Sequence, residues 1–133
     1  MTSRHTHTHT HCIPKAPVPT GWSAQIVKTS DAGKTWTSEF EANNTFYFNE
    51  IDCAPGNNKH CCAVAEDSNN AYVYCSTDGG PWTAAWTGTG TPGKKVYTMM
   101  GLEFVTSTEA WACGGTIGVP VRQVRNKTIK IKS

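Results

Sequence analysis

Three acidic residues lie in β-prone segments of the 133-residue chain and have the chemistry of a glycosidase pair: Glu50, Asp52 and Glu103. Such enzymes place two carboxyl groups at a fixed separation around the scissile bond. Asp52 and Glu103 fall at equivalent positions of an internal repeat, so we interpret them as the polar side of a strand. His60 is the only histidine after His11 and lies in a turn segment, where we expect it to be solvent-exposed. No Ser-His-Asp arrangement is therefore indicated.

A second candidate chemistry is metal binding by alternating histidines near the N-terminus, which are His5, His7, His9 and His11. An extended chain would place these imidazoles on one side, and imidazole suits transition metals. No acidic residue fixes that geometry, and a Pro-rich stretch follows. We interpret residues 1–20 as a low-complexity, non-globular tail, or as sequence read from a misplaced start, and we expect neither a metal site nor a cofactor.

The six cysteines bear on the cellular compartment and are Cys12, Cys53, Cys61, Cys62, Cys75 and Cys113. An even count in a small, turn-rich chain is typical of an oxidising compartment. No apolar signal segment follows Met1, which is in conflict with secretion. A missing true N-terminus would reconcile the two clues, so we predict a secreted or extracellular protein, with plastid and cytoplasmic locations as alternatives.

Two of the cysteines are placed to staple neighbouring strands. Cys53 and Cys61 flank a turn of seven residues, 54–60, and we predict a disulfide between them. Such a bridge stabilises a fold by about 2 to 3 kcal/mol on the loop-entropy estimate. Cys62 should face the other side of a regular strand. Free buried thiols and a metal or redox site stay open as alternatives, although adjacent cysteines are not a metal-ligand spacing.

The composition favours short strands joined by turns. Charged residues make up 17% of the chain, and there are 12 Gly and 7 Pro. The net charge of +2 gives no field that would attract a nucleic acid or a membrane. No apolar run approaches the roughly 18 residues of a membrane helix. Basic residues gather late in the chain, so we interpret residues 120–133 as a solvated basic tail.

Two internal matches indicate a repeat within residues 21–119. Residues 24–33 align with residues 71–80 at an offset of 47 throughout. A second match has an offset of 51 that becomes 49, and it joins 51–53 with 102–104 and 62–65 with 111–114. Periods in the forties fit a four-stranded propeller blade. Because no window has helical periodicity, we predict an all-β fold.

Each copy of the first match ends in a short motif. The first motif reads Thr29-x-Asp31-x-Gly33-x-Thr35-Trp36. The second reads Ser76-x-Asp78-x-Gly80, with Trp82 one residue early and Pro81 in its ending. The motif resembles the Asp-box (BNR repeat) of β-propellers, and residues 21–119 are similar to the photosystem II stability/assembly factor-like group. The resemblance implies a partial β-propeller of four-stranded antiparallel blades, about two of them.

The chemistry of the motif gives its residues structural roles. The Asp31 carboxylate is expected to accept hydrogen bonds from turn amides, and the Thr29 hydroxyl to add a local bond. Gly33 and Gly80 are expected to adopt a backbone conformation that other residues resist. Trp36 is expected to pack beneath the turn between neighbouring sheets. We therefore predict turn roles rather than catalysis for the aspartates.

Sialidases share this propeller and motif, and their chemistry requires an arginine cluster that clamps a carboxylate. The arginines of this chain all lie outside the repeat region and are Arg4, Arg122 and Arg125. Propellers typically use about 4 to 8 blades, and 133 residues are too few for four blades of this period. We therefore expect a fragment of a longer protein that cannot close a ring alone.

These observations predict a non-catalytic binding or assembly scaffold built from Asp-box propeller blades. Its loops would present a surface to a protein or glycan partner, and its open blade edges would permit self-association. The alternative is a fragment of a carbohydrate-active enzyme, either sialidase-like or glucan hydrolase-like. The missing arginines and blades make us favour a chain that is not an enzyme.

Overall fold

The chain is built from β-strands. The computed structural model describes residues 10–14, 24–42, 47–91, 95–118 and 125–132. Within these ranges there are strands and no helix, which confirms the predicted all-β class. The strands are β1 (Thr10–Pro14), β2 (Ala24–Lys28), β3 (Thr37–Ala42), β4 (Tyr47–Ala54), β5 (Asn57–Glu66), β6 (Ala71–Ser76), β7 (Thr83–Gly88), β8 (Lys95–Thr106), β9 (Glu109–Gly118) and β10 (Arg125–Lys132).

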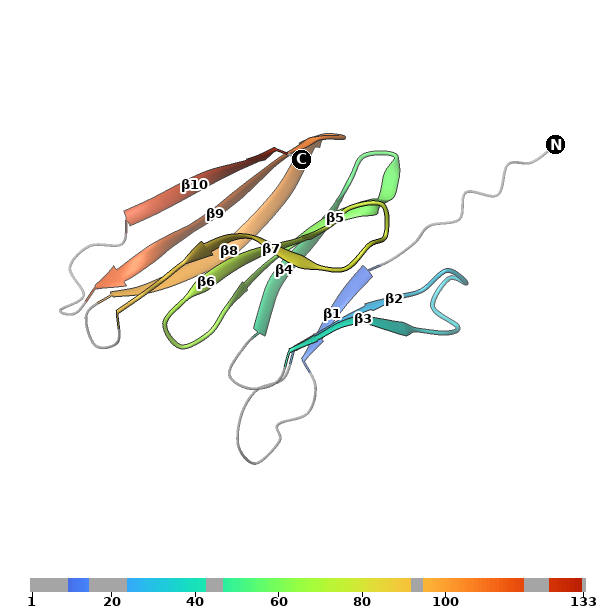
Figure 1. The fold of residues 1–133 in the computed structure, drawn as a ribbon, viewed down its shortest axis with the longest axis horizontal. Coiled ribbons are helices and arrows are strands. Elements are labelled where there is room, and N and C mark those ends of the chain that lie inside the picture. Colours follow the sequence, from blue (N-terminus) through green and yellow to red (C-terminus); the bar gives the residue numbers. More distant parts are fainter. Residues whose placement is uncertain (1–9, 15–23, 43–46, 92–94, 119–124, 133) are drawn as a thin grey trace, which may run out of the picture.

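The strands form three antiparallel sheets (Figure 1). The first sheet has the order β1-β2-β3, the central sheet β4-β5-β6-β7 and the third sheet β10-β9-β8. In each sheet, strands that follow one another in the chain are hydrogen-bonded neighbours. β1 lies against β4, and both β4 and β5 lie against β8, so the central sheet is placed between the other two.

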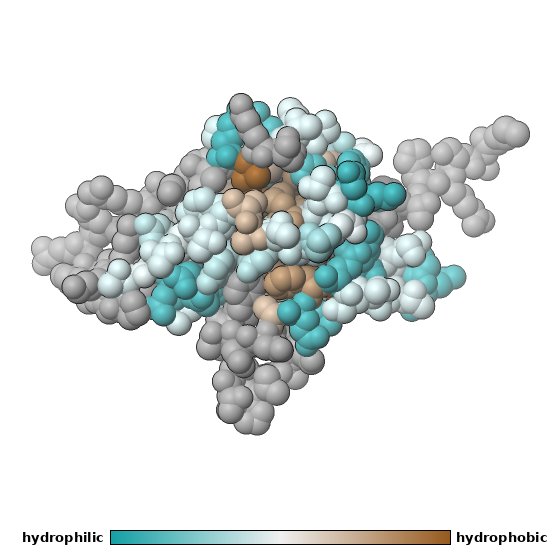
Figure 2. Space-filling model, in the orientation of Figure 1, coloured by the Kyte–Doolittle hydropathy of each residue, from teal (hydrophilic) through white to brown (hydrophobic). Residues whose placement is uncertain are grey.

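The central sheet buries both of its faces, because alternate residues of β5 point in opposite directions. On one face Cys62 and Val64 pack with Leu102 of the third sheet. On the other face Ala63 packs with Ile26 of the first sheet. None of these side chains is more than 5% exposed. The core therefore forms two layers, and the described surface in Figure 2 is mainly hydrophilic, with small apolar patches near its middle.

The hairpins β4–β5 and β8–β9 share one pairing register. In β4 the register shifts between Phe48 and Glu50, which leaves Asn49 as the extra residue of a bulge. In β8 it shifts between Met99 and Gly101. The two shifts are 51 residues apart, which is the offset of the sequence repeat. The repeat is thus reproduced at the level of single residue pairs, including an irregularity that a chance match would not share.

The hairpins β2–β3 and β6–β7 match in the same way. The register of the first shifts between Ile26 and Val27, and that of the second between Val73 and Tyr74. These shifts are 47 residues apart, which is the other sequence offset. The first sheet therefore corresponds to β5-β6-β7 of the central sheet, and the third sheet to β4-β5-β6.

Two strands lie in segments that the sequence analysis assigns to tails. β1 falls within residues 1–20 and pairs with β2, and β10 falls within residues 120–133 and pairs with β9. Isoleucine and lysine alternate from Thr128 to Lys132, a period-two pattern typical of a strand that the basic composition concealed. The side chains of the N-terminal histidine array lie outside the described residues.

Two disulfides attach β5 to both of its neighbours. The predicted Cys53–Cys61 bridge is confirmed and joins β4 to β5. A second bridge, which the sequence analysis does not predict, joins Cys62 to Cys75 on β6. Cys61 and Cys62 are adjacent and point to opposite faces, so one bridge lies on each face of the sheet. Such bridges fit an oxidising compartment.

Candidate functional site

The first motif forms a self-contained polar turn between β2 and β3. Thr29 is 1% exposed, and its hydroxyl donates to Asp31 Oδ1 over 2.8 Å. The same hydroxyl oxygen accepts the amide of Gly33 at 2.9 Å. Ala32 and Gly33 both have positive φ, of 59° and 88°. This reversal is favourable for glycine and costly for alanine, so the hydrogen bonds must hold the turn in place.

Asp31 links the two ends of this turn. Its Oδ1 accepts the Thr35 amide at 2.9 Å, and its Oδ2 accepts the Thr35 hydroxyl at 2.6 Å. Hydrogen bonds from the Thr35 side chain and amide, with a further bond from Thr29, lower the pKa of Asp31 from 3.8 to about 2. Donors that bind the charged form of a carboxylate have this effect. A carboxylate held this way is a structural acceptor and a poor general acid.

Trp36 corrects one expectation about the motif. This indole was expected beneath the turn between neighbouring sheets, but it is 41% exposed. Its Nε1 donates to the Gly33 carbonyl over 3.1 Å, so the ring folds back over its own turn. The five defined positions of the first motif, from Thr29 to Trp36, are therefore brought together in one hydrogen-bonded unit.

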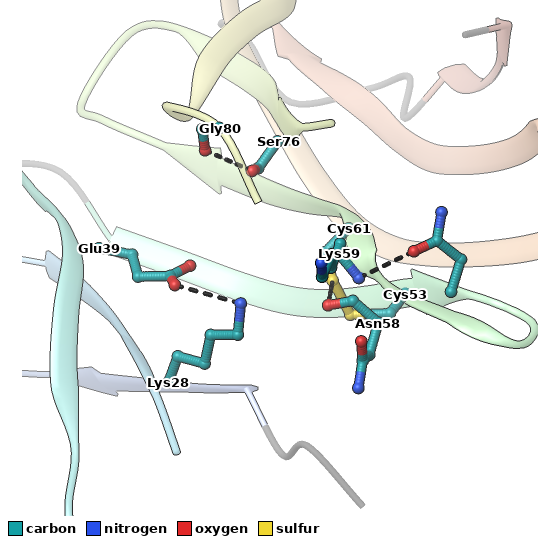
Figure 3. Close-up of polar contacts among 9 residues, drawn as sticks. Lys28, Glu39, Cys53, Asn58, Lys59, Cys61, Ser76 and Gly80 are labelled. Carbon is teal, nitrogen blue, oxygen red and sulfur yellow. Dashed lines mark hydrogen bonds and ion pairs between the residues drawn. A yellow bond between two sulfur atoms is a disulfide. The ribbon is translucent and has the colours of Figure 1, made fainter. Parts of the chain in front are cut away.

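The second motif is held by backbone groups. The Ser76 hydroxyl donates to the Gly80 carbonyl over 2.6 Å (Figure 3). The Gly80 amide binds the Thr77 carbonyl at 2.9 Å, and the Gly79 amide binds the Lys59 carbonyl of β5 at 2.8 Å. The positive φ expected at Gly80 occurs instead at Gly79, at 70°. The shortened ending of the motif moves the reversal one residue earlier.

Asp78 and Trp82 contribute to the second turn differently from Asp31 and Trp36 in the first. Asp78 has a φ of 54° and makes no side-chain hydrogen bond to the described residues, unlike Asp31. Trp82 is 7% exposed and packs with Cys61 and Ala63 of β5. Its Nε1 is buried without a hydrogen-bond partner among the described residues. The apolar contact of this ring therefore outweighs the cost of an unpaired donor.

The acidic candidates of β4 bind the backbone of the next sheet. Glu50 Oε2 accepts the Leu102 amide at 2.7 Å, and Asp52 Oδ2 accepts the Phe104 amide at 2.8 Å. Asn49, at the bulge, donates through Nδ2 to the Met99 carbonyl over 2.6 Å. β8 is the edge strand of its sheet, and edge strands carry unpaired amides and carbonyls. The side chains of β4 satisfy these groups and so lock the two sheets together.

Glu66 forms a further link between the central and third sheets, which the sequence analysis does not single out. It accepts the hydroxyls of Tyr47 and Thr98 and, at 3.2 Å, the amide of Met99. The pKa of Tyr47 is raised to about 12 by burial, by the hydrogen bond to Glu66 and by the negative charge of Glu66. The signal in the sequence was an acid directly after the apolar run Cys61–Ala65, where a buried carboxylate requires partners.

Among the described residues, no hydrogen bond joins the carboxylates of the three acids considered for hydrolysis. Glu50 Oε2 and both carboxylate oxygens of Asp52 accept backbone amides. Glu103 is exposed on β8 and has no hydrogen bond to either of them within the described part of the chain. Asp52 therefore has a structural use, because it satisfies an edge amide of β8, whereas its repeat equivalent Glu103 makes no such bond within the described residues.

His60 was expected to be an exposed turn residue, and this expectation was wrong. It lies in β5, is 5% exposed, and its ring packs edge-on against Phe104 at 5.0 Å between centroids. The strand extends to Asn57, so the turn is shorter than the sequence suggested. A cavity of about 360 Å³ beside His60 is lined also by Thr77, Thr83 and Ile131. No carboxylate is among the described residues that line this cavity.

Among the described residues, no group of three or more histidine, cysteine or acidic side chains is arranged to hold a metal ion. The same part of the chain contains no helix of the length and apolarity needed to cross a membrane. No family model, curated protein or solved structure matches this sequence.

Proposed function

We propose that the chain is a non-catalytic binding or assembly scaffold built from Asp-box propeller blades. The observation that carries this proposal is the agreement between sequence repeat and strand pairing. Offsets of 47 and 51 residues appear in both, down to the position of each bulge. The central sheet has the four antiparallel strands of one blade, and its neighbours supply three strands each. Repeated sheets that bury one another's faces are the basis of such scaffolds.

The use of the acidic side chains supports a non-catalytic role. Asp31 binds its own turn, Asp52 binds β8, and Glu66 joins two sheets. A catalytic pair needs carboxyl groups that are free to exchange protons with a substrate. In this chain these three carboxylates instead accept hydrogen bonds from the backbone of their own turn or of β8.

The proposed partner is a protein or a glycan, and the proposed location is outside the cell. The Cys53–Cys61 and Cys62–Cys75 bridges support secretion, because disulfides persist in oxidising compartments. Exposed aromatic rings at Tyr47, Trp36 and Trp111 offer contact area of the kind enriched in recognition surfaces.

Turnover assays test the proposal against a carbohydrate-active enzyme. We expect no hydrolysis of a fluorogenic sialoside or of a labelled β-glucan by the purified, disulfide-intact chain. The matched control is Glu50→Gln, which removes one carboxylate while retaining an acceptor oxygen for Leu102. Hydrolysis that is lost in Glu50→Gln, with the fold intact by circular dichroism, would overturn the scaffold role. A glycan array on the same sample separates binding from turnover.

A further inference from the structure

We propose that the exposed face of β8 and β9 is a docking surface for another β-hairpin with the chemistry of β8–β9 itself. This open face comprises Gly101, Glu103, Val105, Trp111 and Cys113. The inference rests on the repeat equivalence that underlies the proposed function. It goes further by naming one surface and the kind of partner that fits it.

The open face corresponds, residue by residue, to a face of the central sheet that is covered. Asp52 pairs with Cys62 across β4–β5, and Glu103 pairs with Trp111 across β8–β9. In the same registers Glu50 pairs with Val64, and Gly101 pairs with Cys113. Cross-strand pairs at equivalent positions point to the same side of equivalent hairpins. The side that bears Asp52 and Cys62 in one sheet therefore bears Glu103 and Trp111 in the next.

The occupant of the covered face is known, and it is the β8–β9 hairpin. Leu102 and Phe104 of β8 and Ala112 of β9 pack on Cys62 and Val64. The edge amides of β8 then donate to the carboxylates of β4, with the Phe104 amide 2.8 Å from Asp52 Oδ2. The contact thus requires two features of its occupant: apolar residues at alternate positions, and an unpaired edge that presents amides.

The open face has exposed apolar area and one of the two carboxylate acceptors, because Gly101 stands where Glu50 stands in the covered face. Trp111 is 41% exposed and Val105 is 50% exposed, so apolar area is available. The Glu103 carboxylate has no hydrogen-bond partner among the described residues and stands where Asp52 stands in the covered face. A strand edge would therefore bind Glu103 as β8 binds Asp52.

The aromatic group of the open face is already held in place. Trp111 Nε1 donates to Glu109 Oε1 over 3.1 Å, and the same oxygen forms an ion pair with Lys130 at 2.8 Å. The Lys130 ammonium lies 5.7 Å from the centre of the indole ring. In the central sheet, the positions of Trp111 and Lys130 correspond to Cys62 and Cys75, which form a disulfide. A preorganised indole loses little conformational entropy on contact, as rigid interface anchors do.

A tandem chain tests the docking surface directly. Residues 95–118 are repeated after Ser133 through a flexible Gly/Ser linker, which raises the local concentration of the occupant to the millimolar range. In the appended copy the residues corresponding to Met100 and Trp111 are Leu and Phe, so oxidation of the Met100 and Trp111 side chains reports only on the host. We expect labelling of Trp111 to fall about sixfold, in proportion to the change from 41% exposed to the 7% of Trp82.

Two matched controls define the result. Replacing the residues corresponding to Leu102 and Phe104 by Ser in the appended copy should restore the labelling of the single chain. Glu103→Lys in the host should also restore it, because the acceptor for the edge amides is lost. Unchanged labelling of Trp111 in the tandem chain would overturn the inference, whether the appended hairpin is unfolded or docked elsewhere. Glycoside turnover would overturn the proposed function without bearing on this labelling, so the two failures are distinguishable.

Discussion

The turns that follow β2 and β6 occupy equivalent places in the repeat, yet they are stabilised by different forces. In the first turn, the side chains of Thr29, Asp31 and Thr35 satisfy one another and the backbone, while Trp36 stays 41% exposed. In the second turn, backbone bonds close the loop, and stability comes from Trp82, which is 7% exposed. The better match to the motif is thus the less deeply anchored turn.

The difference shows that one motif can keep its backbone shape while different residues of the motif stabilise it. Both turns place two successive residues at positive φ, at 32–33 and 78–79. Such a reversal needs support from outside the two residues. A polar network provides it in one case, and packing on β5 provides it in the other. Substitutions at equivalent positions should therefore have unequal effects.

The largest contrast is expected at the two tryptophans. Trp82→Ala should destabilise the fold by about 3 to 5 kcal/mol, because it removes a buried ring from the core. Trp36→Ala should cost at most about 1 kcal/mol, since it removes a half-exposed ring and one hydrogen bond. Urea denaturation followed by circular dichroism measures both.

Trp82→Phe is the matched control for the first prediction. It retains most of the apolar contact and removes the unpaired Nε1 donor. It should therefore cost much less than Trp82→Ala. Equal losses for Trp82→Ala and Trp36→Ala would show that the two turns are anchored alike, contrary to the comparison drawn here.

A smaller contrast in stability is expected for the hydroxyl residues at the start of the two turns. Thr29→Val should destabilise by about 1 to 3 kcal/mol, because it leaves the Gly33 amide and Asp31 without a buried partner. Ser76→Ala removes a single bond to the Gly80 carbonyl and should cost about 0.5 to 1.5 kcal/mol. The ratio of the two losses, from denaturant midpoints at a common slope, checks the prediction, and a larger loss at Ser76 would reverse it.

The smallest expected effect is a pH dependence of the stability that the first turn contributes. The pKa of Asp31 is about 2 in the folded protein and near 3.8 otherwise. A depressed folded pKa contributes stability that is fully present above about pH 4 and is lost as the pH falls through about 2. The stability gap between the native chain and Asp31→Asn should accordingly narrow between pH 5 and pH 2.5. A gap that widens over this range would contradict the hydrogen bonds assigned to the carboxylate.

Several parts of the fold were accessible from the sequence because they depend on local chemistry. Period-two runs predicted the strands, and the repeat offsets predicted equivalent hairpins whose registers match. The Cys53–Cys61 bridge followed from two cysteines on either side of one turn. The period-two runs and the Cys53–Cys61 pair lie within a few residues of the structure that they specify, and the repeat needs only the comparison of two segments.

The remainder depends on which sheets meet, and no local pattern encodes that. The burial of Trp82 and the exposure of Trp36 follow from their neighbours on β5 and not from the motif. Asp52 was recognised as a polar strand residue, but its acceptor role needed the edge of β8 to be in place. The Cys62–Cys75 bridge likewise required the pairing of β5 with β6. This pairing brings together two cysteines that are 13 residues apart in the sequence.

The central claim is that acids of one sheet satisfy the edge amides of the next, as Asp52 does for Phe104. Amide hydrogen exchange at Phe104, measured by NMR in the native chain and in Asp52→Ala, tests it most directly. We expect this amide to be protected in the native chain and to exchange about tenfold to a hundredfold faster in Asp52→Ala, which corresponds to one lost charge-assisted bond. The amides of β9 should change little. Rapid exchange of the Phe104 amide in the native chain, or no change on substitution, would contradict the account.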